Sequence, residues 1–361
     1  MKLIASLRPV AVAAFCSVFL VAASAQTSAN PPPAQSKADA DWDTLRSAQA
    51  NTEVANVSVN DTADPASRKA ARDKQAAKFA MLADQAKDFY SKTPDHAHAH
   101  EARKFEVLAL VQAAQAGDTA MEGRLETTAA IFRANMNIPA AIRVQGAGAV
   151  DFAREMRKAK GKAGRIDAAE RVARGLIAEF PTQPQGYESL LTLAGIFDNA
   201  KAGTVAHELL ASAAPDAIKT GAQVVLDRLA LIGQSLSAVL EEAGVGKGKW
   251  AKAGQASVVF SWATWSPGSV ALGQMLAKRN IGKANVIAVN LDEDTVAAAK
   301  LEQSANLPGK SLYDERGLAG AVASRLKLTT APQVYFVDSA GIIRDVRGVD
   351  DLEAKLTQYG L

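Results

Sequence analysis

The sequence contains the segment VVFSWATWSPGS (residues 258–269), in which three local signals follow one another. The run from Val258 to Trp262 is apolar and β-prone, which predicts a buried strand. A short turn then leads to Ser266 and Pro267. A serine hydroxyl can cap a helix, and a proline at the first helical position loses no hydrogen bond. We therefore expect a strand, a turn and a helix in that order, with Ser266 as the N-cap.

The same residues resemble the active-site segment of thioredoxin-like proteins, in particular the TlpA/ResA-type periplasmic branch, which reads V-V-x-F-W-A-T-W-C-x-x-C. Residues 262–265 match this pattern, whereas Ser266 and Ser269 occupy the positions that hold cysteine in the family. Thiol–disulfide exchange needs a thiolate, and a serine can neither form a disulfide nor ionise usefully near neutral pH. The resemblance therefore implies a thioredoxin-like domain without its redox pair and without a catalytic residue.

A second segment adds to this resemblance. Thr330, Ala331 and Pro332 precede an apolar strand and are similar to the cis-proline loop of the family. A proline that heads a strand is also compatible with ordinary strand chemistry. In the family, the backbone before this proline pairs with an extended segment of a partner. The resemblance thus implies a peptide-binding groove formed by Trp265, Ala331 and Pro332, with simple packing as the alternative role of Trp265.

Strand and helix patterns alternate through residues 255–361, which we assign to this α/β thioredoxin-like domain. The order β-α-β-α-α-β-β-α is that of a thioredoxin-like sheet flanked by helices. The β-hairpin that usually precedes the first core strand in the TlpA-type branch is not visible. The expected strands are 258–262, 286–291, 333–337 and 342–346, and the expected helices are 269–279, 295–305, 318–326 and 351–359.

Residues 41–243 are predicted to form an all-α domain, because apolar residues recur three and four positions apart with no alternating strand pattern. The breaks divide it into helices that resemble helical-hairpin arrays of the tetratricopeptide (TPR-like) type, although the 34-residue consensus does not appear cleanly. Residues 244–254 are rich in glycine and lysine but lack the order of a phosphate-binding loop, so we expect a linker. The expected helix breaks are 93–95, 117–118, 138–139, 161–164, 180–184, 201–203 and 214–216.

The first residues have the pattern of a secretory signal peptide, which we place at residues 1–25. Lys2 and Arg8 precede an apolar run, and Ala23-Ser24-Ala25 forms an A-x-A cleavage site. Residues 26–40 are rich in proline, serine and alanine and are expected to form a disordered tether. The one cysteine, Cys16, lies in the signal peptide, so the mature chain would hold no thiol. We expect a periplasmic or secreted protein with no membrane span after cleavage.

The composition is that of an ordinary globular protein, and 361 residues are enough for two domains. The formal net charge of +3 gives no reason to expect nucleic acid as a partner. His96 and His100 are four apart and close to Glu101, which is a possible metal-ligand spacing. Solvated histidines in a first helical turn capped by Asp95 are the interpretation that we favour. We expect neither a metal nor another cofactor.

These patterns predict a secreted, redox-inactive thioredoxin-like protein that acts by binding a protein or an extended peptide. Two alternatives come from other classes. One is a TlpA-like thiol–disulfide oxidoreductase that takes part in redox homeostasis through partner thiols, and the other is a helical-repeat scaffold. A serine hydrolase is disfavoured, because all four histidines lie before residue 244 and no G-x-S-x-G motif surrounds Ser266 or Ser269.

Overall fold

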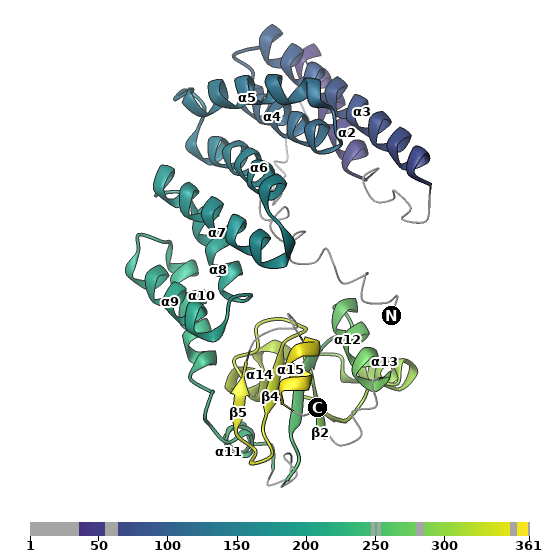
Figure 1. Cartoon of the computed structure of the whole chain (residues 1–361), viewed down its shortest axis with the longest axis vertical. Coiled ribbons are helices and arrows are strands. Elements are labelled where there is room, and N and C mark those ends of the chain that lie inside the picture. The colour runs from purple at the N-terminus through teal and green to yellow at the C-terminus, as the bar shows by residue number, and fades with distance from the viewer. Residues whose placement is uncertain are drawn as a thin grey trace. The chain divides into compact units, whose positions relative to one another are not determined.

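The computed structural model describes residues 36–54, 64–246, 250, 254–278, 285–346 and 352–359. The expected signal peptide lies outside these residues. Contacts divide the chain into two compact units between Leu190 and Leu191 (Figure 1). The first unit is helical. The second contains further helices and then a mixed five-stranded sheet, which is consistent with a thioredoxin-like C-terminal domain after a helical region.

Capping side chains and short turns define the helices of the first unit. Asp64 accepts from the backbone N–H groups of Ala66 and Ser67, and Pro65 is the first helical residue of α3. The first helix begins at Lys37, so residues 37–40, which we had assigned to the tether, are helical. The described helices are α2 (Lys37–Val54), α3 (Pro65–Lys92), α4 (Ala99–Gln115), α5 (Thr119–Ala134), α6 (Ala140–Lys158), α7 (Gly161–Glu179) and the first part of α8 (Pro184–Ala194).

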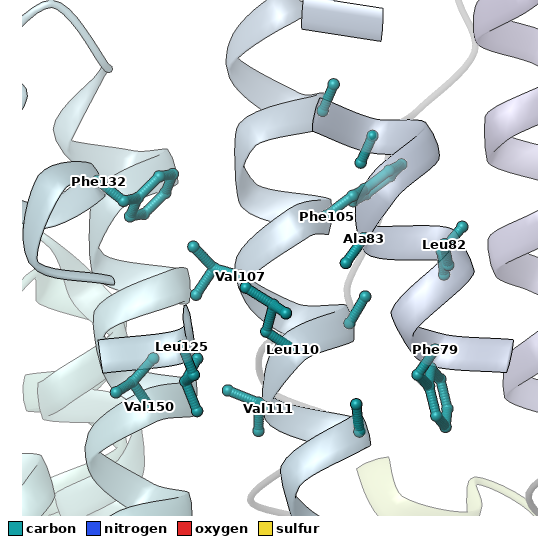
Figure 2. Packing of buried hydrophobic residues seen from close by; sticks show 14 of the residues in the cluster. Phe79, Leu82, Ala83, Phe105, Val107, Leu110, Val111, Leu125, Phe132 and Val150 are labelled. Carbon is teal, nitrogen blue, oxygen red and sulfur yellow. The ribbon is translucent and has the colours of Figure 1, made fainter. Parts of the chain in front are cut away.

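The core of the first unit surrounds α4. Figure 2 shows Leu110 and Val107 of α4 between the side chains of α3 and those of α5 and α6. Leu110 is completely buried. Because α4 is apolar on most of its circumference, it can serve as the central helix of this unit. The larger members of the cluster are Trp42, Leu45, Phe79, Leu82, Phe89, Phe105, Val107, Leu110, Val111, Leu125, Phe132, Ile138 and Val150.

Three helices precede the sheet in the second unit: α9 (Asn199–Ala211), α10 (Asp216–Leu229) and α11 (Leu236–Glu242). The break that we expected at 201–203 is wrong, because these residues lie inside α9. The helix begins directly after Asp198, whose side chain accepts from the backbone N–H of Lys201 at 2.8 Å. An aspartate cap outweighed the helix-breaking tendency of Gly203. Within the described part of the chain, no helix combines the length and the apolar character needed to cross a membrane.

The sheet has the strand order β3-β2-β1-β4-β5. β1 is parallel to β2, β2 is parallel to β3, and β4 pairs antiparallel with both β1 and β5. The strands are β1 (Ser257–Trp262), β2 (Asn285–Asn290), β3 (Lys310–Leu312), β4 (Val334–Val337) and β5 (Ile343–Asp345). The connecting elements are α12 (Pro267–Lys278), α13 (Thr295–Ala305), the 3₁₀ helix η3 (Gly317–Ala319), α14 (Ala321–Arg325) and α15 (Leu352–Gln358).

The sheet-containing region differs from our expectations in two places. Strand β3 was not predicted, because three residues are too few to show an alternating pattern. It follows Gly309, which has a φ of +90°, and a side chain there would collide with the carbonyl oxygen of Val286. The helix expected at 318–326 is split into η3 and α14, with Gly320 in an extended conformation between them.

Helices cover both faces of the sheet. One cluster joins Phe260 and Trp262 to residues of α12, α13 and α15. The opposite cluster joins Val259 and Tyr335 to α11 and α14. Leu236 and Leu240 of α11 are completely buried in this second cluster, and Trp250 is also buried there. Leu236 and Leu240, which we had placed in the helical domain, and Trp250, which we had placed in the linker, therefore cover one face of the sheet. A hinge at 244–254 stays a prediction.

Candidate functional site

The segment from Trp262 to Ser269 connects the end of β1 to the start of α12, as we expected. Its two tryptophans have opposite environments. Trp262 is fully buried, whereas 53% of Trp265 is exposed. The turn between strand and helix therefore presents one large apolar side chain to solvent, next to the position that holds the redox pair in the family that the sequence resembles.

The hydroxyl of Ser266 does not cap the helix, contrary to our expectation. It donates instead to the carbonyl oxygen of Ala331, at 2.8 Å. The backbone of Ser266 still takes part in the helix start, since its carbonyl accepts from the N–H of Ser269 at 2.9 Å. The structure thus brings Ser266 and Ala331 together, although they are far apart in the sequence.

Ser269 is completely buried, and both of its hydrogen-bonding roles are used locally. Its hydroxyl donates to the carbonyl of Ser266 at 2.6 Å and accepts from the backbone N–H of Ala263 at 3.1 Å. A serine nucleophile needs a base that takes its proton. Because Ser266 and Ser269 both donate to backbone carbonyls, neither hydroxyl is poised for attack on a substrate.

The loop that contains Ala331 is fixed by a serine inside β1, which sequence reasoning missed. The Ser261 hydroxyl donates to the carbonyl of Thr330 at 3.1 Å and accepts from the backbone N–H of Gln333 at 2.8 Å. A polar residue between Phe260 and Trp262, in a strand that is buried on both faces, was the available signal. The Ala331–Pro332 peptide bond is cis, as the resemblance implied.

The same loop is supported from α10 by Arg228. Its Nε donates to the carbonyl of Lys327 at 3.2 Å, and its Nη2 donates to the hydroxyl of Thr329 at 3.2 Å. Burial lowers the pKa of the Arg228 guanidinium. Nothing in the sequence around Arg228 marks it as a partner of a loop about one hundred residues later.

Asp292 is a buried carboxylate that holds the turn in place. Its oxygens accept from the backbone N–H of Thr264 at 2.9 Å, from the Thr264 hydroxyl at 2.7 Å and from the Asn290 amide at 2.7 Å. Since these three hydrogen bonds occupy the carboxylate oxygens, Asp292 positions Thr264 and the adjoining Trp265. Sequence reasoning missed it, although the polar residues at the end of an apolar strand were a usable signal.

Among the residues predicted for the groove, Trp265 is exposed, Ala331 is largely buried and Pro332 is partly buried. The backbone N–H of Ala331 has no hydrogen-bond acceptor among the residues that the structure describes. Its carbonyl accepts one bond, from Ser266, and a carbonyl oxygen has two lone pairs. One donor and one acceptor position therefore remain on the backbone of Ala331.

The histidines that we considered as metal ligands lie in the first unit, at the start of α4. The Nε2 atom of His96 lies 3.2 Å from an oxygen of Asp39, and its Nδ1 accepts from the backbone N–H of His98. α4 begins at Ala99 after an N-cap at His98, so our assignment of the cap to Asp95 is wrong. Within the described ranges, no group of three or more histidine, cysteine or acidic side chains could hold a metal.

Comparison with known proteins gives matches among solved structures. No family profile and no curated protein matches the chain. A thiol-disulfide oxidoreductase from Bacteroides fragilis is 21% identical over 29% of this chain and 82% of its own, with a TM-score of 0.26. The structure of MTB dsbF in its mixed oxidized and reduced forms is 21% identical over 30% of this chain and 82% of its own, with a TM-score of 0.25. These structural neighbours are thiol–disulfide oxidoreductase domains, and they cover about 30% of the chain.

Proposed function

We propose that the chain binds an extended peptide segment of another protein at the turn between β1 and α12, without thiol–disulfide exchange. The observation that supports this proposal best is the hydrogen bond from the Ser266 hydroxyl to the Ala331 carbonyl. This bond ties the former redox position to the loop of the predicted groove and commits the hydroxyl proton to the backbone. The groove would therefore act through shape and main-chain groups.

Strand addition needs backbone donors and acceptors at an accessible edge. The N–H of Ala331 is one such donor, since no acceptor for it lies in the described part of the structure. Trp265, which is 53% exposed, would supply an apolar anchor beside it. Aromatic anchors of this kind often carry a large share of the binding energy at an interface.

The absence of thiol chemistry follows from the sequence. The 361 residues contain one cysteine, Cys16, which belongs to the predicted signal peptide. No pair of cysteines is therefore present to form a disulfide within the chain. Residues 1–25 are the basis for placing this binding function in the periplasm or outside the cell, and this location is part of the proposal.

The first test of the proposal measures thiol–disulfide exchange activity. The mature protein should show no turnover in insulin reduction. The double substitution Ser266→Cys/Ser269→Cys should give an oxidisable pair, because the two positions lie one helical turn apart at the start of α12. Measurable turnover by the unsubstituted protein would contradict the proposal, and it would favour the alternative in which partner thiols complete a redox cycle.

The binding role is tested by capturing a partner from periplasmic extract and titrating the matching peptide against Trp265→Ala. We expect an affinity loss of at least about tenfold, which is the usual size of an effect at an aromatic anchor. Val296→Ala is a matched control, because Val296 is 63% exposed and lies on α13. Equal affinities of both variants, with unchanged circular dichroism, would remove Trp265 from the site. Binding that survives deletion of residues 249–361 would favour the helical scaffold.

A further inference from the structure

The first unit contains a pocket of about 490 Å³ that no motif in the sequence indicated. It lies between α3, α4 and α5, and its size falls in the usual range of small-molecule sites. Its lining combines cationic side chains, hydroxyl and amide groups, and apolar residues. Sites for small ligands typically have this mixture of apolar surface with a few polar groups.

A buried carboxylate fixes one wall of the pocket. Glu106, whose side chain is 3% exposed, accepts from the Tyr90 hydroxyl at 2.6 Å and from Arg124 Nη2 at 3.0 Å. Arg124 also donates to Asp84 at 2.6 Å. The charge of Arg124 is thus offset by two carboxylates, so this arginine belongs to the wall and is not the group that would receive an anion.

Two cations of the pocket remain without an acidic partner. The guanidinium of Arg103 lies over the Tyr90 ring, with 4.1 Å between its central carbon and the ring centroid. No ion pair or hydrogen bond joins the side chain of Arg103 or Lys87 to the residues that the structure describes. The ring contact is a cation–π contact and uses none of the N–H groups of Arg103 as hydrogen-bond donors to an oxygen, so these donors can serve a carboxylate.

The stacking platform is itself held in place. Burial raises the pKa of the Tyr90 hydroxyl, and the hydrogen bond to Glu106 raises it further. Tyr90 therefore stays protonated and keeps donating to Glu106 throughout the neutral pH range. This bond fixes the ring over which the Arg103 guanidinium lies, which favours the same position of the guanidinium before and after a ligand binds.

Apolar residues supply the rest of the lining. Phe132 and Ile138 are buried, while Ile131 is 63% exposed at the pocket. An exposed isoleucine next to unpaired cations offers a surface for the apolar body of a ligand whose charged end meets Arg103. Thr128 adds a hydroxyl to the same lining.

We propose that this pocket binds an organic carboxylate with an apolar body, with the carboxylate on Arg103 and Lys87 and the body against Ile131 and Phe132. Such a group occurs in free carboxylic acids and at the C-terminus of a peptide. The two sources present the same chemistry to the pocket and differ in the remainder of the molecule, which in a peptide continues into further amide groups.

The test uses the full chain and ligand-observed NMR titrations. 4-Phenylbutyrate is compared with its neutral amide, and the peptide Ala-Ala-Phe with a free C-terminus is compared with the same peptide amidated. We expect the charged form of at least one pair to bind about tenfold or more tightly than its amide, since a charge-assisted hydrogen bond is lost in the amide. The pair that shows the difference identifies the source of the carboxylate.

The variants place the binding at the pocket. Arg103→Gln should weaken the charged probe about tenfold, whereas Lys78→Gln, an exposed lysine of α3 outside the pocket lining, should leave it unchanged. If Arg103→Gln fails to fold, Ile131→Ser should weaken the same probe through its apolar body. Equal binding of acid and amide overturns the proposal. Affinity that is unchanged in both pocket variants, or no saturable binding of either acid, also overturns it.

Discussion

Two sites in this molecule use their polar groups in different ways. At the turn between β1 and α12, Ser266 and Ser269 donate to backbone carbonyls. In the pocket of the first unit, the cations Lys87 and Arg103 have no acidic partner in the described part of the chain, and Glu106 holds the Tyr90 ring over which Arg103 lies. The first site has a clear motif in the sequence, whereas the second has none.

A motif can therefore indicate a local fold without showing which chemistry is available at that position. The residues Trp262 to Trp265 identify the local fold, but the hydroxyls next to them stabilise that fold. Unpaired charges become visible only when α3, α4 and α5 are brought together. Substitutions in each region can test whether the two differ in this way.

The largest expected loss of stability comes from substitutions in the hydrophobic cores of the two units. Leu110 and Leu240 are both completely buried, in the first and the second unit respectively. Replacing either leucine by alanine should cost about 3 kcal/mol, because it removes buried methyl groups and leaves a cavity. Hydrogen exchange measured by mass spectrometry should show faster opening of α3 to α5 in Leu110→Ala and of β1 and β4 in Leu240→Ala.

The Leu240 result is the more informative one, because we had expected residue 240 to belong to the helical domain. Unchanged exchange in β1 and β4 would show that α11 is not part of the sheet core. Faster exchange throughout the chain in both variants would show that the two units unfold as one.

The sequence was sufficient to place four of the strands and the helices α12, α13 and α15 to within a few residues. Alternating or helical apolar patterns are local, and so they can be recognised without the fold. β3 has three residues, and its place depends on the close approach of Gly309 to Val286, which is a tertiary fact. The role of α11 depends on the opposite face of the sheet and was therefore not visible.

For the candidate site, the sequence shows some of the local geometry, while the binding role of the site stays a prediction. Trp265, Ser266 and Ala331 were found from the resemblance, and the structure joins the last two by a hydrogen bond. Asp292 and Arg228 were missed because their partners, Thr264 and Lys327, are distant in the sequence. Long-range polar contacts leave no periodic trace, so a sequence shows the polar residue but not the group that it binds.

The second prediction tests whether Glu106 fixes the pocket wall. Glu106→Gln keeps the shape of the side chain but removes the charge that faces Arg124, so it should destabilise the fold by about 2 kcal/mol. Glu122→Gln is the matched control, since the side chain of Glu122 is 47% exposed in its pair with Arg157 and should contribute less than about 1 kcal/mol. Urea denaturation measures both variants. Equal losses would mean that Glu106 is not a structural part of the wall.

The third prediction tests whether the serines are structural groups. Ser269→Ala leaves the N–H of Ala263 without its acceptor in a buried position and should cost about 1–2 kcal/mol. Ser266→Ala removes one bond to the Ala331 carbonyl and should cost about 0.5–1 kcal/mol. Ser304→Ala, at an exposed serine that donates to the Leu301 carbonyl, should stay within about 0.5 kcal/mol. Thermal denaturation measures all three variants. A larger loss of stability in Ser304→Ala than in the other two would contradict a structural role of Ser266 and Ser269.

The smallest expected effect on stability comes from an ion pair at the surface. Its contribution to stability can be compared with that of the buried Glu106. Glu155 on α6 accepts from Arg171 on α7 at 2.8 Å and from Lys158 at 3.0 Å. The hydrogen bond from Arg171, followed by the one from Lys158, lowers the pKa of the Glu155 carboxyl below its ordinary value of 4.5.

Because the folded-state pKa of Glu155 is lower than its unfolded value, the pair stabilises the fold above about pH 4.5, and this contribution is lost as the pH falls through the lowered pKa. Solvent screening limits it to a few tenths of a kcal/mol. Glu155→Gln should therefore lower the melting temperature slightly at pH 7, and the difference should shrink as the pH falls below 4.5. A difference that does not shrink as the pH falls would show that the glutamine disturbs packing between α6 and α7, because a protonated carboxyl and an amide carry the same charge.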